Sequence, residues 1–256
     1  YLSHFFHPAA IAVIGASERP GSVGRRVLEN LRRAGFGGRL YAVNPKYRTV
    51  CGQHSYRKIS DIDEPVDLAV IACPGRLLPD VMRQCAVHGV RAAIVLSGGT
   101  AALGESAAKQ QAVFAELRRR YGIRIMGPDC LGVIRPSARL NATNSSASAL
   151  PGKLALVSRS GALCTATLDW ANARKIGFST VVSLGEATDV EFGDVLDYLA
   201  TDGETRSILL HVEGISQPRR FMSGLRAAAR LKPVIVMKAG RHREAARLAS
   251  SRSGAA

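Results

Sequence analysis

The sequence is poor in aromatic residues and has no closely spaced pair of cysteines. Aromatic residues make up 5% of the 256 positions, and a single tryptophan is present. The five cysteines are scattered, odd in number and free of C-x-x-C spacing. This pattern excludes a disulfide framework and a cysteine-based zinc site, and it is typical of a reducing compartment. We therefore expect a cytoplasmic protein and assign no metal ligands.

Long apolar runs are also lacking. No run reaches the roughly 20 residues that a membrane-spanning helix needs, so we expect no membrane partner. The first residues do not have the charged and small-residue layout of a secretory signal. They also do not begin with methionine, so we expect further residues upstream.

Acidic residues are outnumbered by basic ones, 20 to 35, which gives a net charge of +15. One interpretation is a polyanionic partner such as nucleic acid. The other is a solvated, arginine-rich surface that also suits phosphate-bearing ligands. The charges are dispersed and fall mainly on predicted helices, so we favour the second interpretation and do not expect nucleic acid.

The sequence does contain a regular alternation of apolar strands and amphipathic helices. At 256 residues the chain has room for one large domain or two ordinary ones, and 46% hydrophobic residues are typical of a packed globular protein. In the first half, the apolar runs end in small or turn-forming residues, at 15–17, 44–46, 73–75, 97–100 and 127–129. Alternating strands and helices predict a doubly wound parallel sheet, whose ligands bind beyond the carboxyl ends of the strands.

The first such strand and its turn are the most informative stretch. Gly15 allows a sharp turn after the strand, and Gly21 and Gly24 allow close approach of a ligand to the backbone. The amides at the start of the following helix would offer an anion site. Only part of the dinucleotide fingerprint is present, and the second strand ends in Lys46 instead of an acidic residue. This favours NADP or coenzyme A over NAD, with a turn that binds no ligand as the alternative.

The second half repeats the pattern after a polar, turn-rich stretch. We predict a first domain at 1–126, a connection at 127–150 and a second α/β domain at 151–256. Near the start of the second domain, residues 158–161 read Ser-Arg-Ser-Gly and precede a helix. Amides, hydroxyls and a guanidinium there would suit a phosphate, but simple N-capping by a serine explains them equally well.

Several motifs in one order resemble the NDP-forming acyl-CoA synthetases, which include the succinyl-CoA synthetase α subunit. They lie at 14–17, 41–46, 127–132, 157–162, 212–214 and 238–241. The resemblance implies a Rossmann-like CoA-binding domain followed by a flavodoxin-like ligase domain. The implied contacts with coenzyme A or acetyl-CoA are Gly15, Ser17, Gly21, Val23, Asn44, Pro45, Lys46, Cys73, Pro74, Ser97 and Gly98. The implied phosphate site is Ser158, Arg159, Ser160 and Gly161, with Glu213 as the acidic residue that supports a phosphohistidine.

The chain departs from this family at the phosphorylated histidine. Arg252 stands in its place, within residues 251–255, and a guanidinium has no lone pair with which to accept a phosphoryl group. One branch of the family loses this histidine: the synthetase-like regions fused to GNAT-type protein lysine acetyltransferases. Residues 167–171, 196–200 and 218–221 are similar to that branch.

We therefore expect a CoA- or acetyl-CoA-binding regulatory region that is not catalytic by itself. Its parent would be a protein lysine acetyltransferase with downstream ATP-grasp and GNAT domains, and ATP, ADP and Mg²⁺ would bind only to that ATP-grasp part. The alternative is the α region of a catalytically active ADP-forming acetate–CoA ligase, with His242 as a substitute nucleophile. An NADP-linked reductase is a third hypothesis, and no catalytic Tyr-Lys pair supports it. The sequence leaves a homo-oligomer open.

Overall fold

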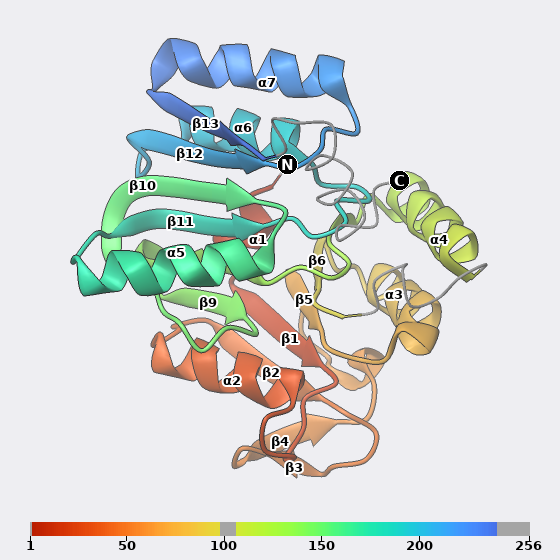
Figure 1. The fold of residues 1–256 in the computed structure, drawn as a ribbon. Coiled ribbons are helices and arrows are strands. Elements are labelled where there is room, and N and C mark those ends of the chain that lie inside the picture. Colours follow the sequence, from red (N-terminus) through yellow and green to blue (C-terminus); the bar gives the residue numbers. More distant parts are fainter. Residues whose placement is uncertain (1, 98–105, 240–256) are drawn as a thin grey trace.

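The chain folds into two sheets with helices on their faces (Figure 1). The computed structural model describes residues 2–97 and 106–239. The strands are β1 (Ala10–Ile14), β2 (Arg39–Val43), β3 (Thr49–Val50), β4 (Gln53–Tyr56), β5 (Leu68–Ile71), β6 (Ala92–Val95), β7 (Arg124–Met126), β8 (Gly132–Arg135), β9 (Leu140–Thr143), β10 (Pro151–Ser158), β11 (Phe178–Ser183), β12 (Ser207–Val212) and β13 (Val234–Lys238). The α-helices are α1 (Ser3–Phe6), α2 (Val23–Arg33), α3 (Leu78–Val87), α4 (Ser106–Tyr121), α5 (Gly161–Ala173), α6 (Phe192–Thr201) and α7 (Pro218–Leu231).

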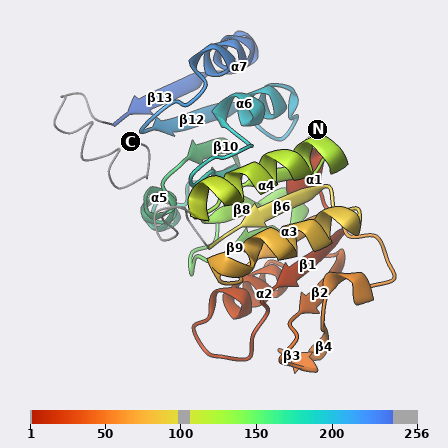
Figure 2. The ribbon, with the colours of Figure 1, turned by 90° about the vertical axis from the view of Figure 1, so that its right-hand side faces the viewer.

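The first sheet has the strand order β3-β4-β2-β1-β5-β6-β7. It is parallel except for the short edge strand β3, which runs antiparallel to β4. Side chains alternate between its faces along β1: Ile11 and Val13 join the core that includes α1 and α2, whereas Ala12 and Ile14 join the core that includes α3 and α4. Figure 2 shows α3 and α4 side by side over that second face. With helices on both faces, the strands are buried and apolar.

The second sheet has the order β13-β12-β10-β11-β8-β9. Four of its strands are parallel, as expected, but β8 and β9 add an antiparallel edge. Both of these strands come from residues 127–150, where we had expected a connection. The polar β9 can be buried because its side chains bond to one another, with Thr143 Oγ1 donating to Asn141 Oδ1 at 2.6 Å.

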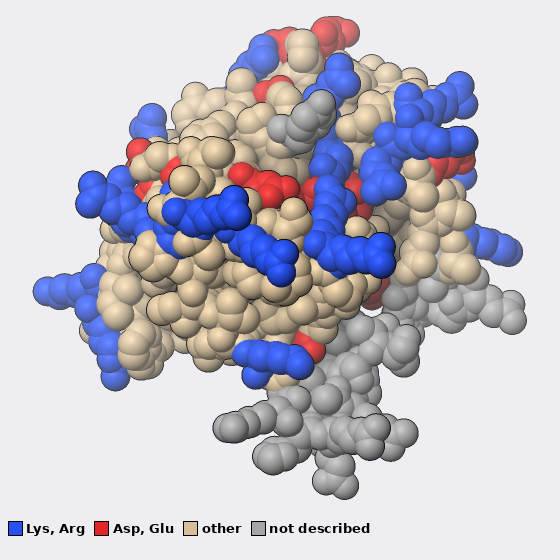
Figure 3. All heavy atoms as spheres, turned by 90° about the horizontal axis from the view of Figure 1, so that it is seen from above, with Lys and Arg blue, Asp and Glu red and all other residues tan. Residues whose placement is uncertain are grey.

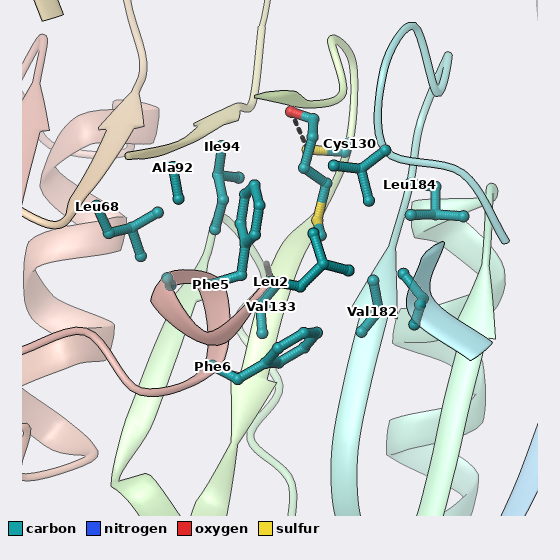
Figure 4. Packing of buried hydrophobic residues seen from close by; sticks show 14 of the residues in the cluster. Leu2, Phe5, Phe6, Leu68, Ala92, Ile94, Cys130, Val133, Val182 and Leu184 are labelled. Atoms are coloured by element: carbon teal, nitrogen blue, oxygen red, sulfur yellow. Dashed lines mark hydrogen bonds between the residues drawn. The ribbon is translucent and has the colours of Figure 1, made fainter. Parts of the chain in front are cut away.

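The two sheets share one hydrophobic core. Leu2, Phe5 and Phe6, in and beside α1, are buried between the sheets and pack in one cluster with side chains from both (Figure 4). The Phe6 ring also stacks on Tyr198 of α6, with ring centroids 4.2 Å apart. A polar contact adds to this, since Asn30 Nδ2 of α2 donates to the Thr143 carbonyl of β9 at 2.9 Å. The two halves are therefore packed directly against each other.

Basic side chains are spread over the face seen from above α7, with acidic side chains between several of them (Figure 3). Elsewhere in the chain, charges of opposite sign are also paired: Lys153 pairs with Glu204 at 2.8 Å, and Arg220 pairs with the buried Asp194. None of the helices in the described ranges combines the length and apolar character that crossing a membrane requires.

Candidate functional site

A large cavity lies at the carboxyl ends of β1, β2 and β5. Its volume is about 980 Å³, within the range of pockets that hold drug-sized ligands and cofactors. The structure brings most of the predicted CoA-binding residues together around it: Gly15, Ser17, Val23, Asn44, Pro45, Lys46, Cys73, Pro74 and Ser97. Gly21 is adjacent in sequence to a lining residue, Ser22, but does not itself line the cavity. Gly98 lies outside the described residues. We call this space the first cavity.

The turn after β1 explains two of its glycines. Gly15 has φ +87°, and a Cβ there would lie 2.6 Å from the Ala72 carbonyl oxygen of the neighbouring loop. A Cβ on Gly24 would lie 2.1 Å from the Gly15 carbonyl oxygen. Gly24 therefore lets α2 pack directly on the turn. We had expected it only to admit a ligand, and the structure gives it a packing role as well.

The start of α2 faces the first cavity with Ser22, Val23 and Gly24. The Ser22 hydroxyl donates to the Arg19 carbonyl at 2.8 Å and does not cap the helix. The first-turn amides of this described helix are thus available to an anion, and the helix dipole favours one there.

The loop after β2 is shaped by Asn44. Its Oδ1 accepts a hydrogen bond from the Lys46 amide at 2.9 Å, and its Nδ2 donates to the Ala16 carbonyl at 2.5 Å. The side chain therefore ties this loop to the turn after β1. Both loops contribute lining residues to the first cavity, Lys46 among them.

Sequence reasoning missed four further cations around this cavity. They are Arg19, Arg57, Lys58 and Arg76. Arg57 and Lys58 directly follow β4, a strand whose polar sequence gives no clear periodic signal. Five positive side chains, with Lys46, make the first cavity suitable for a ligand with several phosphates.

Cys73 lies at the wall of the first cavity between β5 and α3. Burial raises the pKa of its thiol to about 11, so the thiol stays protonated near neutral pH. The Ser97 hydroxyl donates to the Cys73 carbonyl at 2.7 Å, which links the loops after β5 and β6. Cys73 therefore shapes the wall of the first cavity and does not act as a thiolate near neutral pH.

A second cavity, of about 720 Å³, lies between the two sheets at the start of α5. Predicted residues Arg159, Ser160, Gly161 and Glu213 line it. Sequence reasoning missed several others that share it: Arg26, Leu96, Asp129, Asn144 and Glu186. They come from loops and helices of both halves, and only the packing of the sheets brings them together.

The serines of the predicted phosphate site have local hydrogen bonds. Ser160 caps α5, its Oγ accepting from the Leu163 amide at 3.2 Å. Ser158 is fully buried and does not line the second cavity; its Oγ lies 3.1 Å from His211 Nδ1 and accepts from the Ser160 amide at 3.0 Å. Capping is thus present, and the helix start still borders the cavity. Arg252 and His242 lie outside the described residues.

Arg159 has two acceptors within the protein. Its Nε donates to the Gly185 carbonyl at 2.9 Å and its Nη2 donates to the Glu186 carbonyl at 2.8 Å. A Cβ built on Gly214 would lie 3.9 Å from Nη1, so this third nitrogen lies toward the loop after β12. Two nitrogens of the guanidinium that we predicted as part of a phosphate site thus bond to carbonyl groups of the protein.

Comparison with known proteins agrees with this two-part layout. Residues 9–136 match the CoA binding domain, and residues 151–256 match the succinyl-CoA ligase like flavodoxin domain. An ADP-forming acetate–CoA ligase of Archaeoglobus fulgidus is 42% identical over 253 residues, which cover 99% of this chain and 37% of that protein. The α subunit of ADP-forming acetate–CoA ligase I of Pyrococcus furiosus is 40% identical over 257 residues, 99% of this chain and 56% of that protein.

A solved structure is similar throughout the chain. The dinucleotide-forming acetyl-coenzyme A synthetase 1 of Ca. Korarchaeum cryptofilum, in complex with phosphate and ADP, superposes with a TM-score of 0.93 at 36% identity. The match covers 100% of this chain and 55% of that one. This chain therefore spans only about a third to just over half of the length of these relatives.

The family models and the fold together identify a CoA-binding domain followed by a succinyl-CoA-ligase-type flavodoxin-like domain. The chain belongs to the NDP-forming acetate–CoA ligase α-subunit-like family.

Our expectation of a regulatory region of a GNAT-type acetyltransferase is wrong, because the similar proteins are ADP-forming ligases. The motifs behind that expectation include packing residues. Leu168, Leu196 and Phe221 lie on α5, α6 and α7 and are buried, so these motifs reflect the packing of the core.

Proposed function

We propose that this chain is the CoA-binding, α-type part of an ADP-forming acyl-CoA ligase. The observation that supports it is that neighbouring residues of the same elements line the two cavities. On α2, Val23 lines the first cavity and Arg26, one turn further, lines the second. After β6, Leu96 lines the second cavity and Ser97 lines the first. A ligand held in the first cavity can thus present one end to the second.

In this proposal the first cavity binds coenzyme A through its phosphates. The amides at the start of α2 and the cations around the mouth, Lys46 among them, would neutralise the pyrophosphate and the 3′-phosphate. The thiol arm would pass between Val23 and Ser97 toward the second cavity. Acetate is the acid named for several relatives, so a small carboxylic acid is the proposed second substrate.

The second cavity is the proposed place of acyl transfer. The CoA sulfur attacks the carbonyl carbon of an acyl phosphate, the C–S bond forms, and the C–O bond to the phosphate breaks. The thiol proton leaves with the departing phosphate. The amides at the start of α5 and the Ser160 hydroxyl would stabilise the phosphate dianion as it departs.

The nucleotide half of the reaction belongs to other parts in this proposal. The similar Pyrococcus furiosus protein is named as an α subunit, which supports a partner subunit or a further domain for ATP, ADP and Mg²⁺. Arg252 occupies the position that the family resemblance gives to a phosphorylated histidine. The route of the phosphoryl group must therefore be tested directly.

The deciding experiment is to incubate the complete protein with acetate, CoA and ATP. We expect equal amounts of acetyl-CoA and ADP. A His242→Ala variant tests the substitute nucleophile, and Arg252→His tests whether a histidine there raises the rate. Tight binding of CoA with no acetyl-CoA formed would contradict the proposal.

A binding measurement separates the CoA site from turnover. In calorimetric titration, Lys46→Ala should weaken CoA binding by about tenfold, because one charge-assisted contact with a phosphate is lost. Lys109→Ala, at an exposed lysine of α4 outside both cavities, is the matched control and should bind CoA unchanged. Equal affinity in both variants would place CoA elsewhere.

A further inference from the structure

The loop between β11 and α6 belongs to the second sheet but is held by the first. Its Asp189 carboxylate is only 5% exposed and accepts three hydrogen bonds. The donors are Arg118 Nη1 at 3.1 Å, Arg124 Nε at 2.9 Å and the Ile125 amide at 2.8 Å. All three donors lie on α4 and β7 of the first sheet. The charge of Asp189 is thus satisfied entirely across the boundary between the two halves.

Asp189 also affects the ionisation of its partner. Burial alone would lower the pKa of Arg124, but the hydrogen bond and the charge of Asp189, together with Asp194, more than offset this and raise it. Asp194 shares this guanidinium, its Oδ1 accepting from Arg124 Nη2 at 3.2 Å, but its Oδ2 accepts from the Glu191 amide at the start of α6 and so holds a different segment. Asp189 is therefore the carboxylate that holds the loop before the helix.

The same loop lies along the end of β7. The Thr188 amide and hydroxyl both donate to the Gly127 carbonyl, at 3.2 and 3.0 Å. The Glu186 amide donates to the Pro128 carbonyl at 2.9 Å. A Cβ on Gly185 would lie 2.3 Å from the Pro128 oxygen, so the two backbones are in direct contact. The position of the loop therefore follows the position of residues 127–128.

The other side of the loop sets the direction of Arg159. The carbonyls of Gly185 and Glu186 accept from two nitrogens of the guanidinium, and the Gly185 amide donates to the Arg159 carbonyl at 3.2 Å. Arg159 is 8% exposed and lines the second cavity together with these two residues. Since a guanidinium is planar, two fixed acceptors fix the whole group.

We propose that Asp189 is a positioning residue for the second cavity. It pins the loop to the first sheet, so that the carbonyls of Gly185 and Glu186 hold Arg159 beside the start of α5. The inference rests on the proposed function in one respect: the ligand that benefits is the phosphate of that reaction. Asp189 touches no ligand itself and acts through the loop and Arg159.

The first test is amide hydrogen exchange of this chain and its Asp189→Asn variant. An amide group keeps the volume of the carboxylate but presents a donor to a guanidinium. We expect the amides of 185–188 to exchange at least about tenfold faster. The control is Asp202→Asn, which disturbs another buried ion pair, Arg135 Nη2 to Asp202 Oδ1 at 2.7 Å, at the other end of α6 from the loop.

The outcomes separate positioning from general destabilisation. Faster exchange in Asp189→Asn alone supports the inference. Unchanged exchange, or equal acceleration in Asp202→Asn, overturns it. If Asp189→Asn does not fold, Arg118→Gln gives the same test, because it removes one donor from a half-exposed side chain and should produce a smaller change in the same residues.

The second test uses turnover of the complete protein toward ATP, from acetyl-CoA, ADP and inorganic phosphate. Asp189→Asn should raise the KM for phosphate by about tenfold, with the KM for acetyl-CoA within twofold of the wild type. In the double variant, Asp189→Asn should add little to the effect of Arg159→Lys on the KM for phosphate, because both changes act on the group at position 159. Additive effects, or a parallel rise in both KM values, overturn the inference. A wild type without turnover contradicts the proposed function instead, and the exchange data still decide the role of Asp189.

Discussion

Gly24 shows how one missing side chain determines the geometry of the first cavity. Its α-carbon stands so close to the turn after β1 that a methyl group would meet the Gly15 carbonyl at 2.1 Å. Backbone atoms cannot move aside as a flexible side chain can. The start of α2, and with it the amides that face the cavity, therefore depends on glycine at this position.

Gly24→Ala should lower the free energy of unfolding by about 1–3 kcal/mol, the usual cost of overpacking, and should weaken CoA binding as α2 shifts. Urea unfolding and calorimetric titration measure the two effects. Gly203→Ala is the matched control, since nothing lies within 4 Å of the added Cβ and we expect a change within about 0.5 kcal/mol. Equal losses in the two variants would show that the contact at Gly24 is unimportant.

The buried thiols make a prediction about reactivity. Cys51 is partly exposed, whereas Cys73, Cys85, Cys130 and Cys164 are buried. Burial raises the pKa of Cys73 to about 11 and that of Cys164 to about 12. Because the thiolate is the reactive form, iodoacetamide at about pH 8 should modify Cys51 first in the folded chain.

Mass spectrometry of labelled peptides checks this expectation. Labelling of Cys73 should rise by about tenfold for each pH unit until its pKa is reached, provided the fold persists. A Cys51→Ser variant should lose the fast reaction. Rapid labelling of Cys73 at neutral pH would mean that its thiol is accessible and ionised.

Among single residues, the sequence could predict those that lie on loops after strands. The parallel topology alone brings these loops to one edge of the sheet. Lys46 and Cys73 share the first cavity for this reason. The sequence could not predict that Arg159 would be held by the carbonyls of Gly185 and Glu186, which depend on how two loops meet. Asp189 had no signal either, since its partners are distant along the chain.

Among the elements, β8 and the end of α6 are joined by the most buried ion pair. Arg135 donates to Asp202 at 2.7 and 3.1 Å and to Thr180 Oγ1 at 2.8 Å. Burial alone would raise the pKa of Asp202, but the hydrogen bonds from Arg135 and Thr205 more than offset this and lower it. The pair ties β8, in the antiparallel part of the second sheet, to the residue that follows α6.

Asp202→Ala should destabilise the fold by about 3–5 kcal/mol, since it leaves a buried guanidinium without its partner. The pH dependence follows from the lowered pKa. The contribution of Asp202 is fully present above its ordinary pKa of 3.8 and is lost as the pH falls through the folded-state value. Urea unfolding below about pH 4 should therefore show a smaller loss of stability in the variant than in the wild type. Parallel curves would contradict this.

Elements with regular apolar patterns were predicted well, and those with polar sequences were not. β9 reads Leu-Asn-Ala-Thr, and its polar side chains suggested a loop. In the fold, Asn141 and Thr143 bond to each other and are buried. Local composition cannot reveal this, because the partners that make a polar strand tolerable appear only after folding.

At the scale of the whole molecule, the two halves are joined by a shared hydrophobic cluster. A single hydrophobic cluster contains residues of both sheets, and the rings of Phe5 and Phe6 lie inside it. If α1 were displaced from its place between the sheets, apolar surface of both halves would be exposed to water. We infer that the two halves unfold together.

Phe6→Ala should lower the free energy of unfolding by about 3–5 kcal/mol, because it leaves a cavity and removes the stacking on Tyr198. Differential scanning calorimetry should show one transition in wild type and variant, with equal calorimetric and van't Hoff enthalpies. Two separate transitions, of which only one moves, would show that the halves unfold independently.

The cations around the first cavity also have a kinetic consequence. Five positive side chains and one acidic one, Asp80, line this cavity, and on a chain of net charge +15 they create a positive field that extends about a Debye length into solution. A multiply charged anion is drawn in before it makes any contact. Its association rate constant should fall steeply as salt is added, while its dissociation rate changes little, so capture of dilute ligand will depend on ionic strength.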